Sequence, residues 1–221
     1  MDTRSEWLRR DRARSFRSRS HPLFAAVYDR LTAGLERDVL GPRRARLLAD
    51  LGGQVLEVGA GTGASLAHFR RATRVVASEP DPAMRKRLAA KLTEARVPVE
   101  LSEAAAESLP FPHASFDAVV FVCTLCTVTD LDRALAEVRR VIAPRGRLVL
   151  IEHVRGEGRL ARWQDRITPL WSLVAGGCHP NRDTPEAIER AGFAFERIER
   201  FDPLPAWVPT RPMVEAVARP D

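Results

Sequence analysis

Short apolar runs alternate with amphipathic stretches over most of the chain, and this alternation is its main structural signal. Five short runs have the length and composition of buried strands: residues 55–58, 74–78, 97–101, 116–122 and 147–154. Stretches with helical spacing separate them, at 64–70, 82–95 and 131–142. Strands that alternate with helices indicate an α/β fold with a mostly parallel sheet and helices on both faces. Two later strand-like segments, 193–201 and 213–218, extend the expected sheet to seven strands.

Two helical regions lie outside this alternation. Between residues 21 and 50, apolar side chains recur at steps of three and four, which predicts a helical cap interrupted by Gly41-Pro42. Residues 157–174 predict a further helix that ends near Gly176-Gly177, so we expect a helical lid insertion over about 155–185. We therefore divide the chain into a basic arm (1–20), an N-terminal helical cap (21–50) and one α/β domain (51–221).

The positive charge of the chain is concentrated at its N-terminus. Residues 1–20 contain seven arginines and three acidic residues, so they carry most of the net charge of +6. The nearly neutral remainder argues against nucleic acid as a partner, because phosphates require a sustained basic track. Three cysteines, no membrane-length apolar run and no secretory signal predict a cytoplasmic protein with reduced thiols. Weak contact of residues 1–20 with a membrane surface stays open, as does the oligomeric state.

The most informative motif is the glycine-rich turn Gly59-Ala60-Gly61-Thr62-Gly63, which follows the first apolar run. Glycines there allow a sharp turn and let a ligand approach the main chain. The G-x-G-x-G spacing differs from the G-x-G-x-x-G of dinucleotide sites, and the charge of Glu57 would repel a pyrophosphate but suits an ammonium group. Glu79 ends the second run, where a carboxylate can accept both hydroxyls of a ribose. These residues predict a nucleoside cofactor that carries an amino group.

With these features, residues 21–221 resemble the class I S-adenosylmethionine-dependent methyltransferases. Segments 55–63 and 75–84 are similar to the first two motifs of that family, and segments 107–117 and 140–146 to its later ones. The resemblance implies a Rossmann-like fold, S-adenosylmethionine as methyl donor and S-adenosylhomocysteine as product. It also implies further cofactor contacts by Pro80, Met84, Ala106, Glu107, Ser108 and Cys123. The chain departs from the family at Ala105, where an acidic residue often reaches the adenine, so that contact would fall to the backbone and to 106–108.

Three segments carry a narrower resemblance. Leu125–Val128, Glu152–Val154 and Gly177-Cys178 occur in this order in alkyl-thiol S-methyltransferases, which belong to the quinone-biosynthesis-like methyltransferases. This resemblance implies a small, lipophilic acceptor bound between cap and lid. Tyr28 on the cap and His153 at the end of the fifth run are candidate catalytic residues, His153 as a base or as a group that orients the acceptor. The expected substrate pocket is lined by Cys126, Trp163, Trp171, Cys178 and His179.

Cys123 and Cys126 have the C-x-x-C spacing that occurs in zinc and redox sites. Cys178 is the one other cysteine of the chain, so a second C-x-x-C pair is absent. The sequence therefore predicts no metal site. We interpret the three thiols as small buried groups.

The sequence as a whole predicts transfer of a methyl group from S-adenosylmethionine to a small, lipophilic acceptor, with a thiol favoured. A thiol ionises readily near neutral pH, whereas a phenol or an amine needs more help from a base. The alternatives are N-, O- or C-methylation of a natural product or lipid and, from another class, a cofactor-binding protein that acts through a partner.

Overall fold

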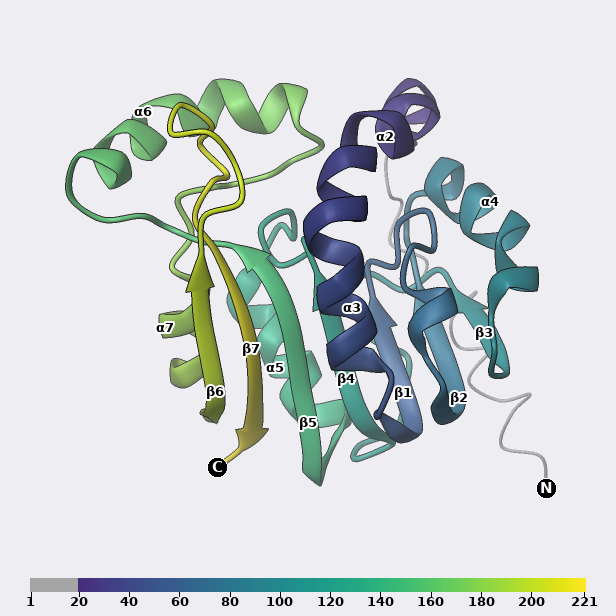
Figure 1. Cartoon of the computed structure of the whole chain (residues 1–221). Coiled ribbons are helices and arrows are strands. Elements are labelled where there is room, and N and C mark those ends of the chain that lie inside the picture. Colours follow the sequence, from purple (N-terminus) through teal and green to yellow (C-terminus); the bar gives the residue numbers. More distant parts are fainter. Residues whose placement is uncertain (1–19) are drawn as a thin grey trace.

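The computed structural model describes residues 20–221, which contain one seven-stranded sheet with helices on both faces (Figure 1). The strands are β1 (Gly52–Val58), β2 (Arg71–Ser78), β3 (Val99–Ser102), β4 (Phe116–Val122), β5 (Ile142–His153), β6 (Phe193–Phe201) and β7 (Met213–Pro220). Their order is β3-β2-β1-β4-β5-β7-β6, and β7 runs antiparallel to both of its neighbours while the other pairs are parallel. The predicted seven-stranded, mostly parallel, Rossmann-like sheet is confirmed.

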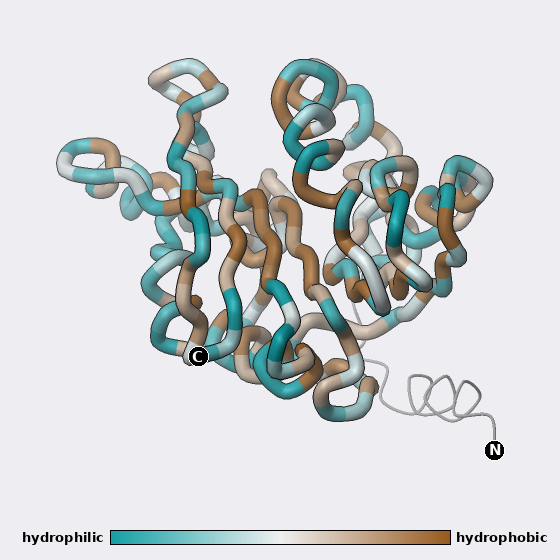
Figure 2. The backbone as a smooth tube through the Cα atoms, turned by 60° about the horizontal axis from the view of Figure 1, so that its bottom comes forward, coloured by the Kyte–Doolittle hydropathy of each residue, from teal (hydrophilic) through white to brown (hydrophobic). Residues whose placement is uncertain are grey.

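Helices cover the two faces of this sheet. They are α2 (Pro22–Leu35), α3 (Gly41–Leu48), α4 (Pro82–Ala90), α5 (Leu131–Val141), α6 (Gly158–Val174) and α7 (Thr184–Arg190), with the short turns η1 (Glu36–Leu40), η2 (Leu66–His68) and η3 (Leu92–Glu94). In Figure 1, α3 lies in front of the sheet, and α5 and α7 lie behind it. The central strands form a hydrophobic layer between them (Figure 2).

Successive residues of the central strands face opposite sides of the sheet, because side chains alternate along a strand. On the α5 and α7 side, Leu56 and Phe121 pack in one buried cluster with Leu135. On the α3 side, Val55 packs in a second cluster with Leu48. These two cores fix the central strands, so the loops that leave the ends of these strands are held in place.

Two local predictions about helices are wrong. The predicted break at Gly41-Pro42 does not occur, because the backbone stays helical from α2 through the π-helical turn η1 into α3. The N–H of Gly41 bonds to the carbonyl of Glu36, and this wider turn accommodates Pro42, which has no N–H to donate. The helix predicted at 64–70 is also absent, and the single 3₁₀ turn η2 stands in its place.

The elements that carry the candidate site meet at one edge of the sheet. The loops after β1, β2, β4 and β5 leave the carboxyl ends of these strands, where ligands of open α/β sheets bind. The N-terminal part of α2 and the whole of α6 extend beyond this edge (Figure 1). No helix within residues 20–221 has the length and apolarity to cross a membrane. The basic arm falls almost entirely on residues 1–19, outside the described residues, and the three-part division of the chain stays a prediction.

Candidate active site

The glycine-rich loop after β1 adopts the conformation that its sequence predicts. Gly59, Gly61 and Gly63 have φ angles of 69°, 57° and 87°, in the left-handed region that favours glycine. The N–H of Gly59 donates to the carbonyl of Ser78 at 2.8 Å, which ties the loop to the end of β2. A Cβ at Gly59 would collide with Thr124, whereas one at Gly61 would meet nothing within 4 Å. The loop is therefore tied to the sheet edge at Gly59 and leaves free space beside Gly61.

Glu57 is a buried carboxylate beneath this loop with an unused oxygen. Its Oε2 has no hydrogen-bond partner among residues 20–221, and the guanidinium Nη1 of Arg44 lies 3.9 Å from its Oε1. Burial raises the pKa of Glu57 to about 7, although the charge of Arg44 opposes this shift. A cation placed beside Oε2 would favour the ionised form. The side chain thus fits the ammonium group that the sequence predicts.

Glu79 holds the loops that follow β1 and β2. Its Oε2 accepts a hydrogen bond from the N–H of Gly61 at 2.8 Å, and its Oε1 accepts one from the N–H of Asp81, also at 2.8 Å. Burial raises the pKa of Glu79, and these two hydrogen bonds oppose the shift. Each carboxylate oxygen has a further lone pair that can accept from a hydroxyl. The predicted role toward a ribose is compatible with this geometry and stays a prediction.

The other predicted cofactor residues lie on the loops after β2 and β3. Pro80 precedes α4, and Met84 is buried in its first turn. Residues 106–108 follow β3, and Ala106 is buried. The Oε1 of Glu107 accepts a hydrogen bond from the N–H of Thr129 at 2.7 Å, so this carboxylate fixes the loop between β4 and α5. Contacts from Ala106, Glu107 and Ser108 to an adenine stay predictions.

The helical cap is connected to the glycine-rich loop by polar contacts. The hydroxyl of Thr62 donates to Oδ1 of Asp29 at 2.6 Å, and Nζ of Lys91 donates to Oδ2 at 3.1 Å. Tyr28, the neighbour of Asp29, packs against Phe24 with ring centroids 5.4 Å apart. Burial raises the pKa of Tyr28, and electrostatic interactions with Cys123 and Cys126 add to the rise. The phenol is therefore un-ionised at neutral pH.

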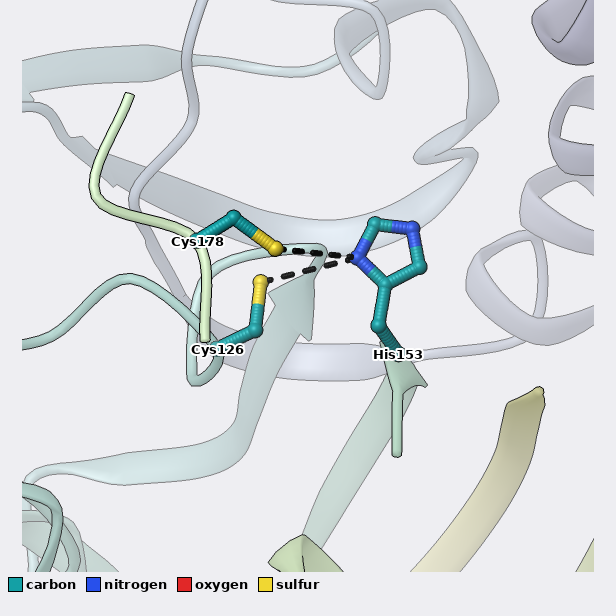
Figure 3. Close-up of side chains that lie close together, drawn as sticks. All are labelled: Cys126, His153 and Cys178. Carbon is teal, nitrogen blue, oxygen red and sulfur yellow. Dashed lines mark hydrogen bonds between the residues drawn. The ribbon is translucent and has the colours of Figure 1, made fainter. Parts of the chain in front are cut away.

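The side chain of His153 lies among three cysteines at this edge, two of which, Cys126 and Cys178, are drawn in Figure 3. Its Nδ1 is 3.6 Å from Sγ of Cys126 and 3.8 Å from Sγ of Cys178, and its Nε2 is 4.0 Å from Sγ of Cys123. Cys126 and Cys178 are buried, and the hydrogen bond between them raises the pKa of Cys126 and lowers that of Cys178. Cys123 has a φ of 55°, which is strained for a side chain with a Cβ. The predicted residues Cys123, Cys126, His153 and Cys178 are thus brought together.

Glu152, the neighbour of His153, organises the loop that carries these cysteines. Its fully buried carboxylate accepts hydrogen bonds from the N–H groups of Thr124 and Leu125 at 2.7 and 2.8 Å and from that of Cys126 at 3.4 Å. The hydroxyl of Thr124 in turn donates to the carbonyl of Gly59 at 3.2 Å. One buried side chain therefore links the end of β5 to the sulfur-bearing loop and, through that loop, to the glycine-rich turn.

Of the remaining predicted pocket residues, Trp171 and His179 lie nearest to this cluster. Trp171 contributes to the lowered pKa of Cys178, and its ring Nε1 is buried without a hydrogen-bond partner among residues 20–221. The N–H of His179 donates to the carbonyl of Cys126 at 2.8 Å, and its ring Nδ1 is buried without a partner among residues 20–221. Trp163 lies about two helical turns before Trp171 on α6, and its place in the pocket stays a prediction.

The sequence analysis did not include Asp29, Arg44 or Glu152 among the site residues. The burial of Arg44 could have been predicted, because Arg44 lies four residues from Leu40 and four from Leu48, and both leucines are buried. A charged residue in such an apolar stripe predicts a buried cation that needs a partner. Glu152 gives a similar signal as an acidic residue inside a buried strand. Asp29 gives none, because Ala25 is the one buried residue of α2 and no apolar stripe surrounds Asp29.

The strand order, the glycine-rich turn and the acidic residues Glu57 before it and Glu79 after it define a Rossmann-like methyltransferase fold. A methyltransferase-domain family profile matches residues 56–150. Thiol S-methyltransferase TMT1A of Homo sapiens is 31% identical over 202 residues, which cover 88% of this chain and 82% of the relative. Ubiquinone/menaquinone biosynthesis C-methyltransferase UbiE of Escherichia coli is 37% identical over 181 residues, 71% of this chain and 69% of the relative. The solved structure of a putative methyltransferase of Bacillus halodurans superposes with a TM-score of 0.68 at 18% identity, covering 81% and 98% of the two chains.

The chain therefore belongs to the S-adenosylmethionine-dependent methyltransferases. It is an enzyme of this family, and S-adenosylmethionine is the methyl donor that the family implies.

Proposed function

We propose that this enzyme transfers the methyl group of S-adenosylmethionine to the sulfur of a small, lipophilic thiol. The observation that carries the proposal is the position of His153, which lies between the strained end of β4 and the two buried cysteines Cys126 and Cys178. The similarity to a thiol S-methyltransferase over 88% of the chain supports the same choice of acceptor.

The donor fits the residues at the glycine-rich loop. Its ammonium group matches the unpartnered Oε2 of Glu57, the buried polar atom that most needs a cation. The open space beside Gly61 lets a ligand approach the backbone, and Glu79 at the end of β2 offers lone pairs to the ribose hydroxyls. The adenine would follow toward Pro80, Met84 and residues 106–108, with the methyl group directed toward Cys123.

The acceptor would bind between the cap and α6. Tyr28 on α2 is electrostatically coupled to Cys123 and Cys126, and Phe24 lies against Gly176, which follows α6. These contacts bring the two helical elements together over the end of β5, where His153 lies. Apolar walls with few polar groups suit a lipophilic small molecule.

The chemistry demands little beyond alignment and exclusion of water. S-adenosylmethionine, when bound, supplies a methyl group that its sulfonium charge has already activated. The chain holds the acceptor sulfur in line with this group, and a thiol with an ordinary pKa of about 8.5 needs only modest help to ionise. Tyr28 is un-ionised and can donate a hydrogen bond to the acceptor, while His153 interacts with its sulfur.

A panel of matched acceptors tests the proposal. Purified enzyme is incubated with methyl-labelled S-adenosylmethionine and with an alkyl thiol, a phenol, an amine and a quinol of similar size. We expect the thiol to be methylated at least about tenfold faster than the other acceptors, because thiolates form at neutral pH. Methylation of the quinol or the phenol in preference to the thiol would overturn the proposal and favour a reaction like that of the C-methyltransferase relative.

We also propose that the enzyme acts in the cytoplasm and makes weak contact with membrane surfaces through residues 1–20. Leu23 and Leu31 on α2 and Leu173 on α6 are 84%, 74% and 81% exposed, and the ends of these helices adjoin at Phe24. Exposed apolar side chains suit insertion into a membrane surface, and the basic composition of residues 1–20 suits an anionic one. Flotation with anionic vesicles should recover the full chain, and recovery should fall when residues 1–20 are deleted. Equal recovery of both forms would exclude a role of these residues.

A further inference from the structure

Three potential metal ligands converge at the end of β5 from separate parts of the chain. They are Cys126 in the loop after β4, His153 at the end of β5 and Cys178 after α6, and their ligand atoms all lie within 4.8 Å of one another (Figure 3). We propose that the two thiolates and Nδ1 of His153 bind a zinc ion, with its fourth position open to water or to the sulfur of the acceptor. The binding of the ion is independent of the proposed function, and its role toward the acceptor rests on that function.

The distances agree with a tetrahedral site. Zinc–sulfur bonds of about 2.3 Å and zinc–nitrogen bonds of about 2.0–2.1 Å place a sulfur and a nitrogen ligand about 3.6 Å apart at the tetrahedral angle. The observed Sγ to Nδ1 distances are 3.6 Å for Cys126 and 3.8 Å for Cys178. Both sulfur atoms therefore lie at ligand-to-ligand spacing from the same nitrogen.

Hydrogen bonding between neutral groups explains this arrangement less well. An unprotonated Nδ1 has one lone pair, so it can accept a hydrogen bond from only one of the two thiols, and the other thiol bonds to the sulfur of the first, which is a weak acceptor. A shared ion satisfies all three atoms at once. The Nε2–H of His153 would then point toward Sγ of Cys123, 4.0 Å away, so Cys123 is a neighbour of the site and not a ligand.

The backbone holds the ligands in place without using their side chains. The N–H of His179 donates to the carbonyl of Cys126 at 2.8 Å, so the two cysteine-bearing loops are joined directly. Nη1 of Arg182 donates to the carbonyl of Leu125 at 2.6 Å, and Glu152 binds the N–H groups of the same loop. Preorganisation of this kind is what a metal site needs from the residues around its ligands.

The ligand set selects the metal. Two thiolates and an imidazole favour zinc over magnesium or calcium, which prefer oxygen. Two thiolates also balance the charge of a divalent cation, so the occupied site is neutral, as its burial requires. Three protein ligands and one open position are the pattern of catalytic zinc sites rather than structural ones.

The open position gives the ion a role toward a thiol acceptor. An acceptor thiol that binds there loses its proton to solvent and becomes a zinc-bound thiolate. A sulfur electron pair then forms the new carbon–sulfur bond, while the bond from the methyl carbon to the sulfonium sulfur breaks and leaves its pair on S-adenosylhomocysteine. The product is a neutral thioether, a poor zinc ligand, and it leaves without any change in the oxidation state of the metal.

Metal content tests the site directly. The full chain is purified reduced and without chelator, and its zinc is measured by mass spectrometry. We expect about one ion per chain in the wild type and less than about 0.1 in Cys126→Ser, Cys178→Ser and His153→Ala, because a catalytic zinc site needs its three protein ligands. Cys123→Ala is the matched control, since it removes a neighbouring thiol and should keep the full content. Thermal unfolding, measured on every metal-free variant, shows that the fold is intact.

Cobalt replacement supplies a spectroscopic signature. Cobalt(II) added to the metal-free wild type should give a thiolate charge-transfer band and intense tetrahedral d–d bands, and both should be lost in Cys178→Ser. Absence of zinc and of these bands in the reduced wild type overturns the proposal, as does a disulfide between Cys126 and Cys178 in the protein as purified under reducing conditions. Equal loss of metal in Cys123→Ala also overturns it.

The two proposals fail in different ways. If the wild type methylates thiols equally well with and without metal, the proposed function stands and the role of zinc is overturned. If the wild type holds one zinc ion through these three residues but methylates no thiol, the site stands and the choice of acceptor is wrong.

Discussion

The hydroxyl of Thr62, in the glycine-rich loop, donates a hydrogen bond of 2.6 Å to the carboxylate of Asp29 on the cap. This contact joins the helix in front of the sheet to the turn on which the cofactor is proposed to bind. Burial would raise the pKa of Asp29, but the hydrogen bonds from Thr62 and Lys91 lower it, so Asp29 is ionised at neutral pH. The position of the cap over the site therefore depends on a charged hydrogen bond.

Removal of this acceptor should loosen the cap. We expect Asp29→Ala to weaken binding of S-adenosylhomocysteine about threefold to tenfold, because the lost hydrogen bond is partly exposed to solvent and contributes roughly 1 kcal/mol. Asp29→Asn is the matched control, since its amide oxygen still accepts from Thr62. Calorimetric affinities that are equal for the wild type and Asp29→Ala would show that the contact does not support the cofactor site.

The free energy of unfolding and the affinity for S-adenosylhomocysteine should change in opposite directions as the pH rises. The pKa of Glu57 is raised by burial to about 7 from its ordinary 4.5, so the folded apoprotein binds the proton more tightly than the unfolded chain does. The free energy of unfolding should then fall as the pH rises from about 4.5 to about 7. The affinity for S-adenosylhomocysteine should rise over about pH 6–7, because the ionised carboxylate pairs with the ammonium group of the ligand.

Glu57→Gln removes this titration with little change of shape. Both trends should be flatter in the variant, and its cofactor affinity at pH 7.5 should be lower than that of the wild type. Chemical denaturation and calorimetry at several pH values measure the two trends. A wild-type affinity that is constant across this range would exclude a charge interaction at Glu57.

Glu79 should contribute to cofactor binding and to the conformation of the glycine-rich loop. Glu79→Ala removes an acceptor for two ribose hydroxyls and for the N–H of Gly61, and hydrogen bonds to a charged group contribute about 1.5–3 kcal/mol each, so affinity should fall at least about tenfold. Glu94→Ala is a suitable control, because it removes a carboxylate at an exposed position. Unchanged affinity in a folded Glu79→Ala protein would exclude the ribose contact.

The sheet was predictable because its signal is local. Continuous apolar runs such as 116–122 can be read without knowing their neighbours, and β4 has the predicted bounds. The glycine-rich loop was equally readable, since its left-handed residues require glycine. The helix predicted at 64–70 failed because local spacing does not show that the chain must return at once to β2.

The site could be predicted only in part, because most of its contacts join residues that are far apart in the sequence. Cys126, His153 and Cys178 are separated by more than twenty residues in sequence, and only the order of the strands brings them together. The sequence analysis interpreted the thiols as small buried groups, whereas the structure places Cys126 and Cys178 together beside His153. Asp29 was missed because its partners, Thr62 and Lys91, lie on other elements far along the sequence.

His153 should act on the acceptor and not on the cofactor. We expect His153→Ala to lower the turnover of a thiol at least about tenfold, since a group in contact with the acceptor contributes on this scale. Affinity for S-adenosylhomocysteine should stay within about twofold of the wild type, because cofactor contacts do not depend on this side chain. His113→Ala, at an exposed position, serves as the control. Turnover equal to that of the wild type on every accepted substrate would remove His153 from the mechanism.

Glu152 should be the residue whose loss most affects the shape of the site. Glu152→Ala leaves the buried N–H groups of Thr124 and Leu125 without an acceptor, and two unsatisfied donors cost about 3 kcal/mol together. For a chain of this size such a loss corresponds to a fall in Tm of roughly 6–12 °C. Glu152→Gln should lower the stability much less. Its carbonyl oxygen can take the place of Oε1, which accepts both short bonds. Only the 3.4 Å bond from the N–H of Cys126 is then lost. Thermal unfolding of the two variants measures the difference. Equal Tm values for Glu152→Ala and the wild type would show that the loop after β4 does not need this carboxylate.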